Sequence, residues 1–301
     1  MAAGAPPEPG CAGCHPGQAA AHAKTNHALA LRPAAQTEFA RALTERPIGE
    51  ARGGYLFFYS ILNSGLDVIA TREGTASGLA RAQILFAFGA GDQGVTPVLR
   101  LGGKWLEHRI SYYPKADRFD LTLGHRPGPS RSGQEALGIE QPAETMRACF
   151  DCHATVTTEG KQETIRAGVG CDRCHPGSAS HAEAPARAVT NPGKLAAASE
   201  VRLCAACHRL TPPGATDDPL NVRFQPLRLA MSRCYQAGQL ACSGCHPAHQ
   251  NARRQDAAFY RERCLACHAQ PHRRDQDCAG CHMPKSSPAP YLAFTDHYIR
   301  K

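Results

Sequence analysis

The sequence has few of the large side chains that usually fill a protein core. Aromatic residues make up 6% of its 301 residues, with a single tryptophan, whereas glycine and proline number 28 and 23. Apolar runs are short, and the longest, Ile84–Phe88, cannot cross a bilayer. This composition argues against a regular α/β enzyme or a β-sandwich as the whole structure. It suggests that something other than side chains fills part of the interior.

The beginning of the chain also lacks the features of a secretory signal. Met1–Gly10 has neither a basic start nor an apolar stretch, and the first cation is Lys24. The cysteine chemistry described next requires assembly outside the cytoplasm. We therefore expect a periplasmic or extracellular protein whose signal peptide has been removed, with no transmembrane segment.

Cysteine and histidine, in contrast, are abundant, with 15 of each. Fourteen of the cysteines form seven Cys-x-x-Cys-His motifs, namely Cys11, Cys14, His15; Cys149, Cys152, His153; Cys171, Cys174, His175; Cys204, Cys207, His208; Cys242, Cys245, His246; Cys264, Cys267, His268; and Cys278, Cys281, His282. This motif attaches c-type haem: the two thiols add to the porphyrin vinyl groups, and the histidine becomes the proximal iron ligand. Neither zinc sites nor disulfides explain a histidine after every second cysteine. We predict seven c-type haems, with iron as the metal.

The remaining cysteine, Cys234, belongs to no motif. We expect a free, partly buried thiol. An axial thiolate, a redox-active thiol and an intermolecular disulfide are the alternatives.

Eight histidines outside the motifs are candidates for the distal axial positions: His22, His27, His108, His125, His181, His249, His272 and His297. They cover seven irons with one to spare. We favour His27, His181, His249 and His297; His108 and His125 lie in the cysteine-free segment, and His22 or His272 is the surplus residue. A histidine close to one motif is expected to ligate a neighbouring haem, because it cannot easily reach around its own. Met146 and Met231 are alternative ligands, although core packing is the more ordinary role for both.

The motifs are unevenly spread, which suggests four regions. We expect an N-terminal segment with the first haem site (1–50), a cysteine-free β-rich module (51–125), a linker (126–145, which overlaps the Gly/Pro/Ser-rich stretch Gly124–Gly138) and a six-haem domain (146–301). The predicted strands are Gly54–Leu62, Leu66–Thr71, Thr96–Leu101, Trp105–Tyr113 and Arg118–Leu123. The predicted helices are Lys194–Leu210 and Asn251–Ala269. The expected fold is a multihaem cytochrome c, mostly irregular with short α-helices around a closely packed haem array, plus a small antiparallel β module.

Several segments resemble the multihaem c-type cytochromes, in the group that contains the tetrahaem electron carriers of ammonia oxidisers and, more distantly, hydroxylamine oxidoreductase and pentahaem nitrite reductase. The resemblance rests on Cys11–His15 followed by Asn26-His27-Ala28, on Gly170–His175 with His181, on Cys242–His249, and on Cys281–Lys285 with the tail that ends at His297. It covers residues 10–30 and 145–300, and it implies distal roles for His27, His181, His249 and His297. The lysine ligand of the nitrite reductases has no counterpart here, because all seven motifs end in histidine.

Three functions are compatible with the sequence. The first is electron transfer along a chain of mostly bis-histidine haems, with other redox proteins as partners and no enzymatic activity. The second is a reductase or oxidase of a small nitrogen or sulfur compound at one open haem. The third is a subunit of a polymeric extracellular cytochrome wire, in which a histidine ligates a haem of the next copy to give a homo-oligomer or filament.

The formal charge of +8 would ordinarily suggest a nucleic-acid partner. A ferric c-type haem with both propionates ionised carries about −1, and a ferrous one about −2. Seven haems would therefore bring the charge to roughly +1 when oxidised and about −6 when reduced. We interpret the basic excess as counter-charge for propionates and expect no nucleic-acid partner.

Overall fold

The computed structural model describes residues 9–45, 47–50, 54–63, 65–72, 74, 79–159, 162–212, 214–238, 240–251, 255–268 and 277–300. The chain divides into a first unit, Met1–Pro6 with Asn26–Val169, and a second unit, Pro7–Thr25 with Gly170–Lys301. The sequence analysis placed the main boundary near residue 145 instead. The observed division groups the first motif with the five C-terminal motifs, and it leaves the Cys149–His153 motif in the first unit.

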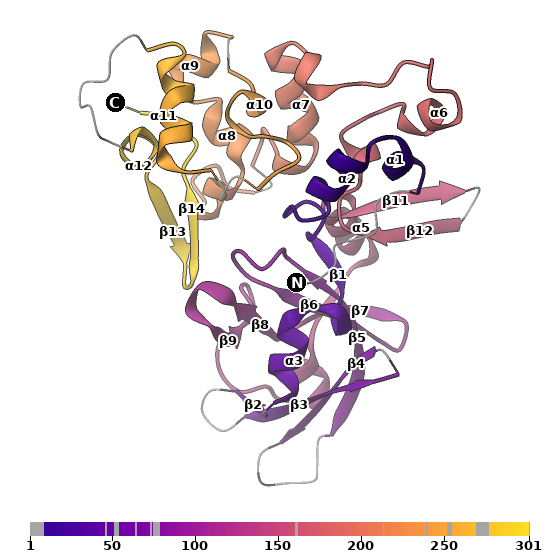
Figure 1. Cartoon of the computed structure of the whole chain (residues 1–301). Coiled ribbons are helices and arrows are strands. Elements are labelled where there is room, and N and C mark those ends of the chain that lie inside the picture. The colour runs from indigo at the N-terminus through magenta and orange to yellow at the C-terminus, as the bar shows by residue number, and fades with distance from the viewer. Residues whose placement is uncertain are drawn as a thin grey trace. The chain divides into compact units, whose positions relative to one another are not determined.

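The first unit is built on an eight-stranded sheet in which every pairing is antiparallel, in the order β10-β7-β6-β5-β4-β3-β2, with β1 also paired to β5 (Figure 1). Its strands are β1 (Leu31–Pro33), β2 (Ile48–Gly49), β3 (Tyr55–Leu62), β4 (Gly65–Arg72), β5 (Ala80–Phe88), β6 (Thr96–Leu101), β7 (Lys104–His108) and β10 (Gly138–Gln141). Two hairpins accompany it, β8 (Ile110–Tyr113) with β9 (Arg118–Leu121) and β11 (Ala154–Glu159) with β12 (Gln162–Ala167). The helices of this unit are α3 (Glu38–Thr44), α4 (Gly133–Leu137) and α5 (Ala143–His153), and its 3-10 turns are η1 (Ala34–Gln36) and η2 (Pro114–Ala116).

Alternating side chains give the sheet two apolar clusters. On β4, Leu66, Val68 and Ala70 are buried while their neighbours are partly exposed, as expected for a strand with one face in a core. They pack in one cluster with residues of α3 and α4. The other cluster joins Leu31 to Met146 and Phe150 of α5. The sheet thus provides the anchorage for the helix that ends in the Cys149–His153 motif.

The predicted strands agree with the structure except at one turn. The predictions for β3, β4, β6 and β9 are confirmed within a few residues. The single strand predicted over Trp105–Tyr113 is wrong, because the chain breaks at Arg109 into β7 and β8. Arg109 is buried there in an ion pair with Glu50, and its guanidinium donates to the carbonyls of Arg126 and Gly128. These contacts direct β8 away from the main sheet to pair with β9.

The stretch over 126–145, predicted to be a linker, contains regular secondary structure. This stretch contains α4, β10 and the start of α5, and Ala136 and Leu137 are buried in the main core. Ser132 accepts a hydrogen bond from the Glu135 backbone N–H and so caps α4. Gly138 has a φ of 152°, and a Cβ there would collide with the Glu107 carbonyl. Gly138, which the sequence analysis counted as part of a linker, therefore permits β10 to pair closely with β7.

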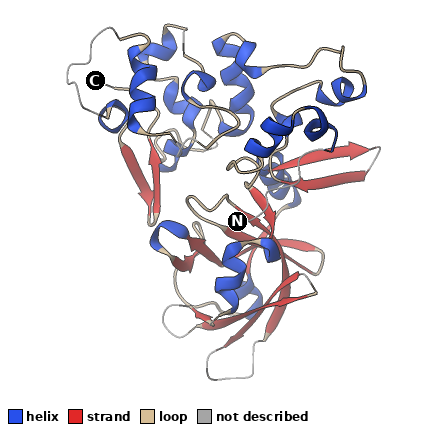
Figure 2. Ribbon diagram, viewed as in Figure 1, coloured by secondary structure: helices blue, strands red, loops and turns tan. Residues whose placement is uncertain are grey.

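The second unit contains mostly short helices and loops, with one hairpin (Figure 2). Its elements are α1 (Pro9–Cys14), α2 (Pro16–His22), η3 (Cys171–Arg173), α6 (Ser178–Glu183), η4 (Pro192–Lys194), α7 (Ala197–His208), η5 (Pro219–Arg223), α8 (Gln225–Leu229), α9 (Arg233–Gln236), α10 (Cys242–Cys245), α11 (Ala257–Leu265), α12 (Cys278–His282), β13 (Lys285–Ala289) and β14 (Leu292–Thr295). The predicted helices over Lys194–Leu210 and Asn251–Ala269 correspond to α7 and the shorter α11. In the described ranges of the whole chain, no helix has the length and apolar character needed to span a bilayer.

Few large side chains fill the interior of the second unit. Among its described residues, the buried apolar ones are Ala19, Val201, Val222 and Leu229, whereas both large apolar clusters belong to the first unit. Six of the seven motifs lie in this poorly filled unit. The unit that contains most of the Cys-x-x-Cys-His motifs is therefore also the unit with few large buried side chains.

Candidate haem-binding sites

All seven Cys-x-x-Cys-His motifs lie on helical turns. In four of them the histidine N–H donates to the carbonyl of the first cysteine: His15 to Cys11 at 2.8 Å, His175 to Cys171 at 2.9 Å, His246 to Cys242 at 2.8 Å and His268 to Cys264 at 3.0 Å. The other three motifs end helices α5, α7 and α12. A helical turn places residues three and four apart on one face. Both thiols and the imidazole of each motif can therefore reach the same porphyrin.

Hydrogen bonds from Nδ1 to carbonyl oxygens orient many of these imidazoles. Nδ1 lies within hydrogen-bond distance of an oxygen in four motif histidines and two others: His153 to the Ala30 carbonyl (3.2 Å), His175 to Thr190 (3.0 Å), His208 to Gln225 Oε1 (2.9 Å), His282 to Arg300 (2.6 Å), His181 to Arg187 (3.0 Å) and His297 to Thr295 (3.0 Å). A carbonyl oxygen only accepts, so Nδ1 is the donor and Nε2 carries the lone pair. Metal-bound histidines characteristically show this arrangement.

Three motif histidines of the second unit each face a histidine from a distant part of the chain. The pairs are His15 with His181 (6.5 Å between ring centroids, 22° between ring planes), His175 with His249 (6.2 Å, 19°) and His246 with His297 (6.0 Å, 40°). These separations are too long for direct ring stacking. Two iron–nitrogen bonds of about 2 Å place the centroids of two axial imidazoles roughly 6 Å apart. The residues present therefore fit a six-coordinate haem iron between the rings of each pair.

The pairs interlock along the chain. His181 follows His175 by a few residues, and it faces His15 rather than His175. His249 likewise follows His246 and faces His175. Each short segment that carries one motif therefore contributes a ring to a different motif. This arrangement is the one expected for histidines that lie too close to their own motif to reach its far side.

Burial keeps several of these rings neutral, as metal coordination requires. Burial and the neighbouring His246 lower the pKa of His297 to about 4. Burial, followed by the nearby His175, also lowers the pKa of His249. For His246 the pKa is lowered by burial and then by His208. Histidines of several motifs thus lie near one another inside the second unit.

Attachment cysteines of different motifs are also neighbours. Burial, followed by the nearby Cys204 and Cys207 thiols, raises the pKa of Cys174 to about 11. Burial raises the pKa of Cys264, with further contributions from Cys278 and Cys245. These contacts connect the motifs that end at His175, His208, His246, His268 and His282 into a continuous series.

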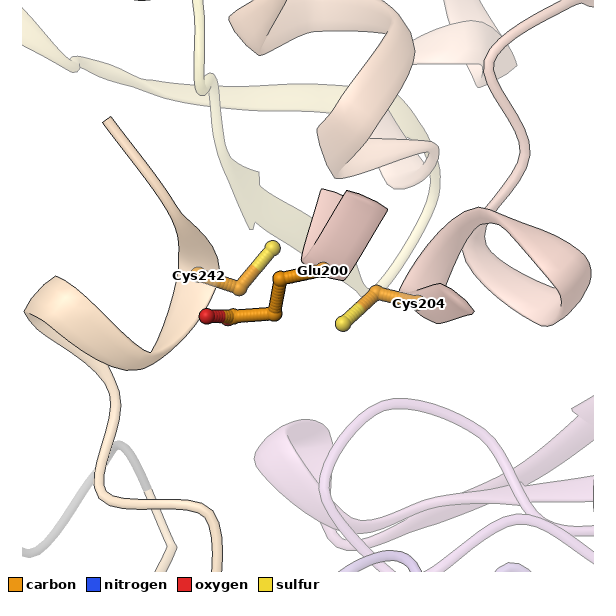
Figure 3. A group of neighbouring side chains, drawn as sticks. All are labelled: Glu200, Cys204 and Cys242. Carbon is orange, nitrogen blue, oxygen red and sulfur yellow. The ribbon is translucent and has the colours of Figure 1, made fainter. Parts of the chain in front are cut away.

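Two motifs also meet at Glu200, Cys204 and Cys242, whose ligand atoms lie within 4.8 Å of one another (Figure 3). Glu200 and Cys204 are one turn apart on α7, and Cys242 begins α10. A carboxylate and two sulfurs can bind a soft metal ion. Both sulfurs here, however, belong to Cys-x-x-Cys-His motifs and are the groups that would bond to haem. Sequence analysis overlooked Glu200, although its position four residues before Cys204 places it on the same helix face.

His108 and His125, two of the predicted distal ligands, lie in the first unit. His108 is fully buried, with Nδ1 2.6 Å from the Leu137 carbonyl and Nε2 2.8 Å from the Tyr59 hydroxyl. Both of its nitrogens are thus committed to the sheet core, and we leave it out of the proposed ligand set. His125 is buried with Nε2 3.3 Å from Glu107 Oε2, while its Nδ1 has no hydrogen-bond partner among the residues that the structure describes.

The remaining candidates are His22, His27 and His272. Burial, followed by His249 and His175, lowers the pKa of His22, which places this ring beside their pair. The exposed His27 has its backbone held by hydrogen bonds to its carbonyl from Ala30 and Val169. His272 falls outside the described residues. The structure therefore brings His181, His249 and His297 to motif histidines, and it places His22 close to one such pair.

The methionines and the unassigned cysteine have ordinary surroundings. Met146 is buried in the apolar cluster beneath α5. Met231 is 46% exposed, and its sulfur accepts from Arg228 at 3.4 Å. Cys234 is half-buried on α9, close enough to Cys245 and Cys264 to raise their pKa values slightly after the larger effect of burial.

Three comparisons with known proteins were made. No curated protein matches the sequence. The crystal structure of outer cell wall cytochrome OcwA matches with 15% identity and a TM-score of 0.40, over 67% of this chain and 36% of that one. The chain thus spans about a third of the length of that cytochrome. Residues 127–176, which contain the Cys149–His153 and Cys171–His175 motifs, match the family described as cytochrome c554 and c-prime. This stretch is thus similar to part of the cytochrome c554 and c-prime domain, a family of multihaem c-type cytochromes.

Proposed function

We propose that the protein carries electrons through seven covalently attached c-type haems, most of them with two axial histidines. The observation that carries this proposal is the set of three imidazole pairs, each joining a motif histidine to a distant histidine at 6.0–6.5 Å. The matched family supports it, because its members are typically electron carriers.

The residues of this chain have three tasks in that function. When bound, haem supplies one-electron redox chemistry at its iron. The motif cysteines fix each macrocycle by two thioether bonds, and each thiol proton passes to a vinyl carbon, so no oxidant is needed. The carbonyl oxygens that accept from Nδ1 orient the imidazoles, and occupied axial positions would keep substrates away from the irons. A series of neighbouring motifs then holds the redox sites close together.

We assign the distal ligands as far as the geometry supports them. His181, His249 and His297 serve the irons of His15, His175 and His246. His22, His27, His125 and His272 are the candidates for the irons of His153, His208, His268 and His282. The expected partners are other redox proteins in the periplasm or outside the cell.

The electron paramagnetic resonance spectrum of the oxidised protein tests the proposal. We expect mainly low-spin ferric haem, and we expect His297→Ala to convert one low-spin haem to a high-spin species. His108→Gln is the matched control, since His108 lies in the sheet core and its replacement should leave the low-spin signals unchanged. A native spectrum dominated by high-spin haem would overturn the proposal.

One observation favours a second candidate, reduction or oxidation of a small nitrogen or sulfur compound at an open iron. Because both ring nitrogens of His108 form hydrogen bonds in the core, seven candidate histidines remain for seven irons, and no histidine is left over. If one of these seven histidines does not bind an iron, one haem lacks a distal histidine and has an open axial position. Binding of cyanide or nitric oxide to a single haem of the native protein would support this function, and the absence of binding would exclude it.

A further inference from the structure

The contact between α7 and α10 contains a buried acid that neither haem attachment nor iron ligation uses. Glu200 is 3% exposed, and its two carboxylate oxygens accept from the backbone N–H and the hydroxyl of Ser243, both at 2.7 Å. In the described part of the chain, no lysine, arginine or histidine forms an ion pair with it. A buried carboxylate without a cation is costly, and it is normally retained only where its charge or its hydrogen bonds have a purpose.

The position of Glu200 indicates where its charge acts. Cys204 and Cys242, the first cysteines of two different motifs, each place a sulfur within 4.8 Å of the carboxylate (Figure 3). A hydrogen bond with Cys242, burial and the charge of Glu200 together raise the pKa of the Cys204 thiol. In the haem-loaded protein these sulfurs become part of two porphyrin edges. The carboxylate of Glu200 then lies beside both edges.

We propose that Glu200 is a tuning residue that lowers the reduction potentials of the two haems attached at Cys204/Cys207 and Cys242/Cys245. This inference rests on the proposed electron-transfer function. A negative charge stabilises the ferric state relative to the ferrous state, because reduction adds a further negative charge to the site. Burial reduces the screening of this charge by water, so it acts more strongly than the carboxylates at the surface. The two haems form a low-potential pair in the middle of the series of motifs.

Two variants separate the charge of Glu200 from its hydrogen bonds. Glu200→Gln removes the charge but keeps an oxygen that can accept from the Ser243 N–H. Ser243→Ala keeps the charge and removes one hydrogen bond, at a position where the Cys11 and Cys278 motifs already have alanine. A purely structural role for Glu200 predicts that both variants lower stability and that neither changes a potential.

A potentiometric titration of the haem-loaded protein, followed by optical and electron paramagnetic resonance spectra, gives the answer. We expect Glu200→Gln to shift two of the seven transitions upward by roughly tenfold in their reduction equilibrium constants, or about 59 mV each. Ser243→Ala should leave every transition in place. Unchanged potentials in Glu200→Gln would overturn the inference. If that variant does not fold, Ser243→Lys offers a second test: it places a cation beside Glu200 from an exposed position and must raise the same two potentials, and their constancy would also overturn the inference.

Failure of this inference can be told from failure of the proposed function. Mass spectrometry of proteolytic peptides first establishes whether haem is attached at Cys204/Cys207 and Cys242/Cys245 in the native protein. Absence of haem there refutes the proposed function at these two sites, and the inference with it. If haem is attached at both sites but their reduction potentials do not change in Glu200→Gln, the inference alone is refuted.

Discussion

At the scale of single residues, the hydrogen bonds of each imidazole separate structural histidines from candidate ligands. His181 and His297 use Nδ1 for a backbone carbonyl and turn toward another histidine. His108 uses Nδ1 for the Leu137 carbonyl and Nε2 for the Tyr59 hydroxyl. Coordination of iron needs a nitrogen lone pair, so the second pattern leaves none available. The first pattern suits the ligand role that we propose for His181 and His297, and the second marks His108 as a structural residue.

The buried position of His108 predicts a specific pH dependence of stability. Burial lowers its pKa to about 4, whereas the unfolded chain titrates near 6.5. Between these values the unfolded state binds more protons than the folded state, so the folded state loses stability as the pH falls from about 6.5 to about 4. His108→Gln can keep both hydrogen bonds without titrating. We expect the difference in unfolding free energy between native protein and variant to change with pH by up to about 1.4 kcal/mol per unit in this window.

Urea unfolding at a series of pH values, followed by far-ultraviolet circular dichroism, measures this difference. Haem ligands contribute equally to both proteins, so only the residue at position 108 separates the two curves. Parallel curves between pH 4 and 6.5 would show that His108 takes up a proton as readily in the folded state as in the unfolded chain, contrary to the prediction.

Sequence reasoning identifies motif residues well and pairings poorly. The Cys-x-x-Cys-His spacing is local, so it can be read without a structure. Whether His181 faces His15 or His175 depends on how segments far apart in sequence pack together. From the sequence, His108 is as good a candidate ligand as His125. Only its hydrogen bonds with the Tyr59 hydroxyl and the Leu137 carbonyl distinguish it. Glu200 likewise becomes notable only through its contact with Ser243 of another helix.

At the scale of elements, α5 shows how the sheet holds a haem motif. Phe150 lies between the two cysteines of the motif in sequence, and it is 3% exposed. Its ring packs against Phe86, Phe88 and Trp105, with centroid distances of 5.8, 5.5 and 5.4 Å. His153 at the end of the helix contacts Phe88 at 5.2 Å. Strands β5 and β7 therefore position this motif through aromatic contacts.

Truncation of Phe150 should loosen this motif. We expect Phe150→Ala to lower the unfolding free energy by about 3–5 kcal/mol, because it removes a buried ring and leaves a cavity. The haem content should fall from seven toward six per chain, since α5 no longer presents its cysteines well. Denaturant unfolding and the ratio of haem to protein measure the two effects. Arg147→Ala on the exposed face of the same helix is the control, and an equal loss in both variants would contradict the role assigned to Phe150.

The elements that sequence reasoning missed depend on partners distant in sequence. Strand β5 contains mixed small, polar and aromatic residues and a bulge between Ile84 and Phe86, so its pattern lacks simple alternation. Helix α4 lies in a stretch rich in glycine, proline and serine, and only the burial of Ala136 and Leu137 shows that it belongs to the core. In contrast, β3 and β4 alternate cleanly and were predicted nearly to the residue.

At the scale of the whole molecule, the two units fill their interiors in different ways. The first unit has two apolar clusters and one haem motif, whereas the second has six motifs and few large buried side chains in its described residues. A haem offers a large flat apolar surface, and its burial stabilises a fold as burial of side chains does. The division of the chain into units is thus also a division between a side-chain core and an interior that we propose haem to fill.

This difference predicts how the chain behaves without haem. In full-length protein produced where haem is not attached, we expect β3–β7 of the first unit to remain protected from amide hydrogen exchange. Helices α7–α12 of the second unit should exchange rapidly, because without haem little apolar surface is buried to offset the conformational entropy of ordering them. Hydrogen exchange followed by mass spectrometry, with the haem-loaded protein as the reference, resolves the two units in one experiment. Equal protection of both units in the haem-free chain would show that side chains alone fold the second unit, and it would remove the structural reason for placing six haems there.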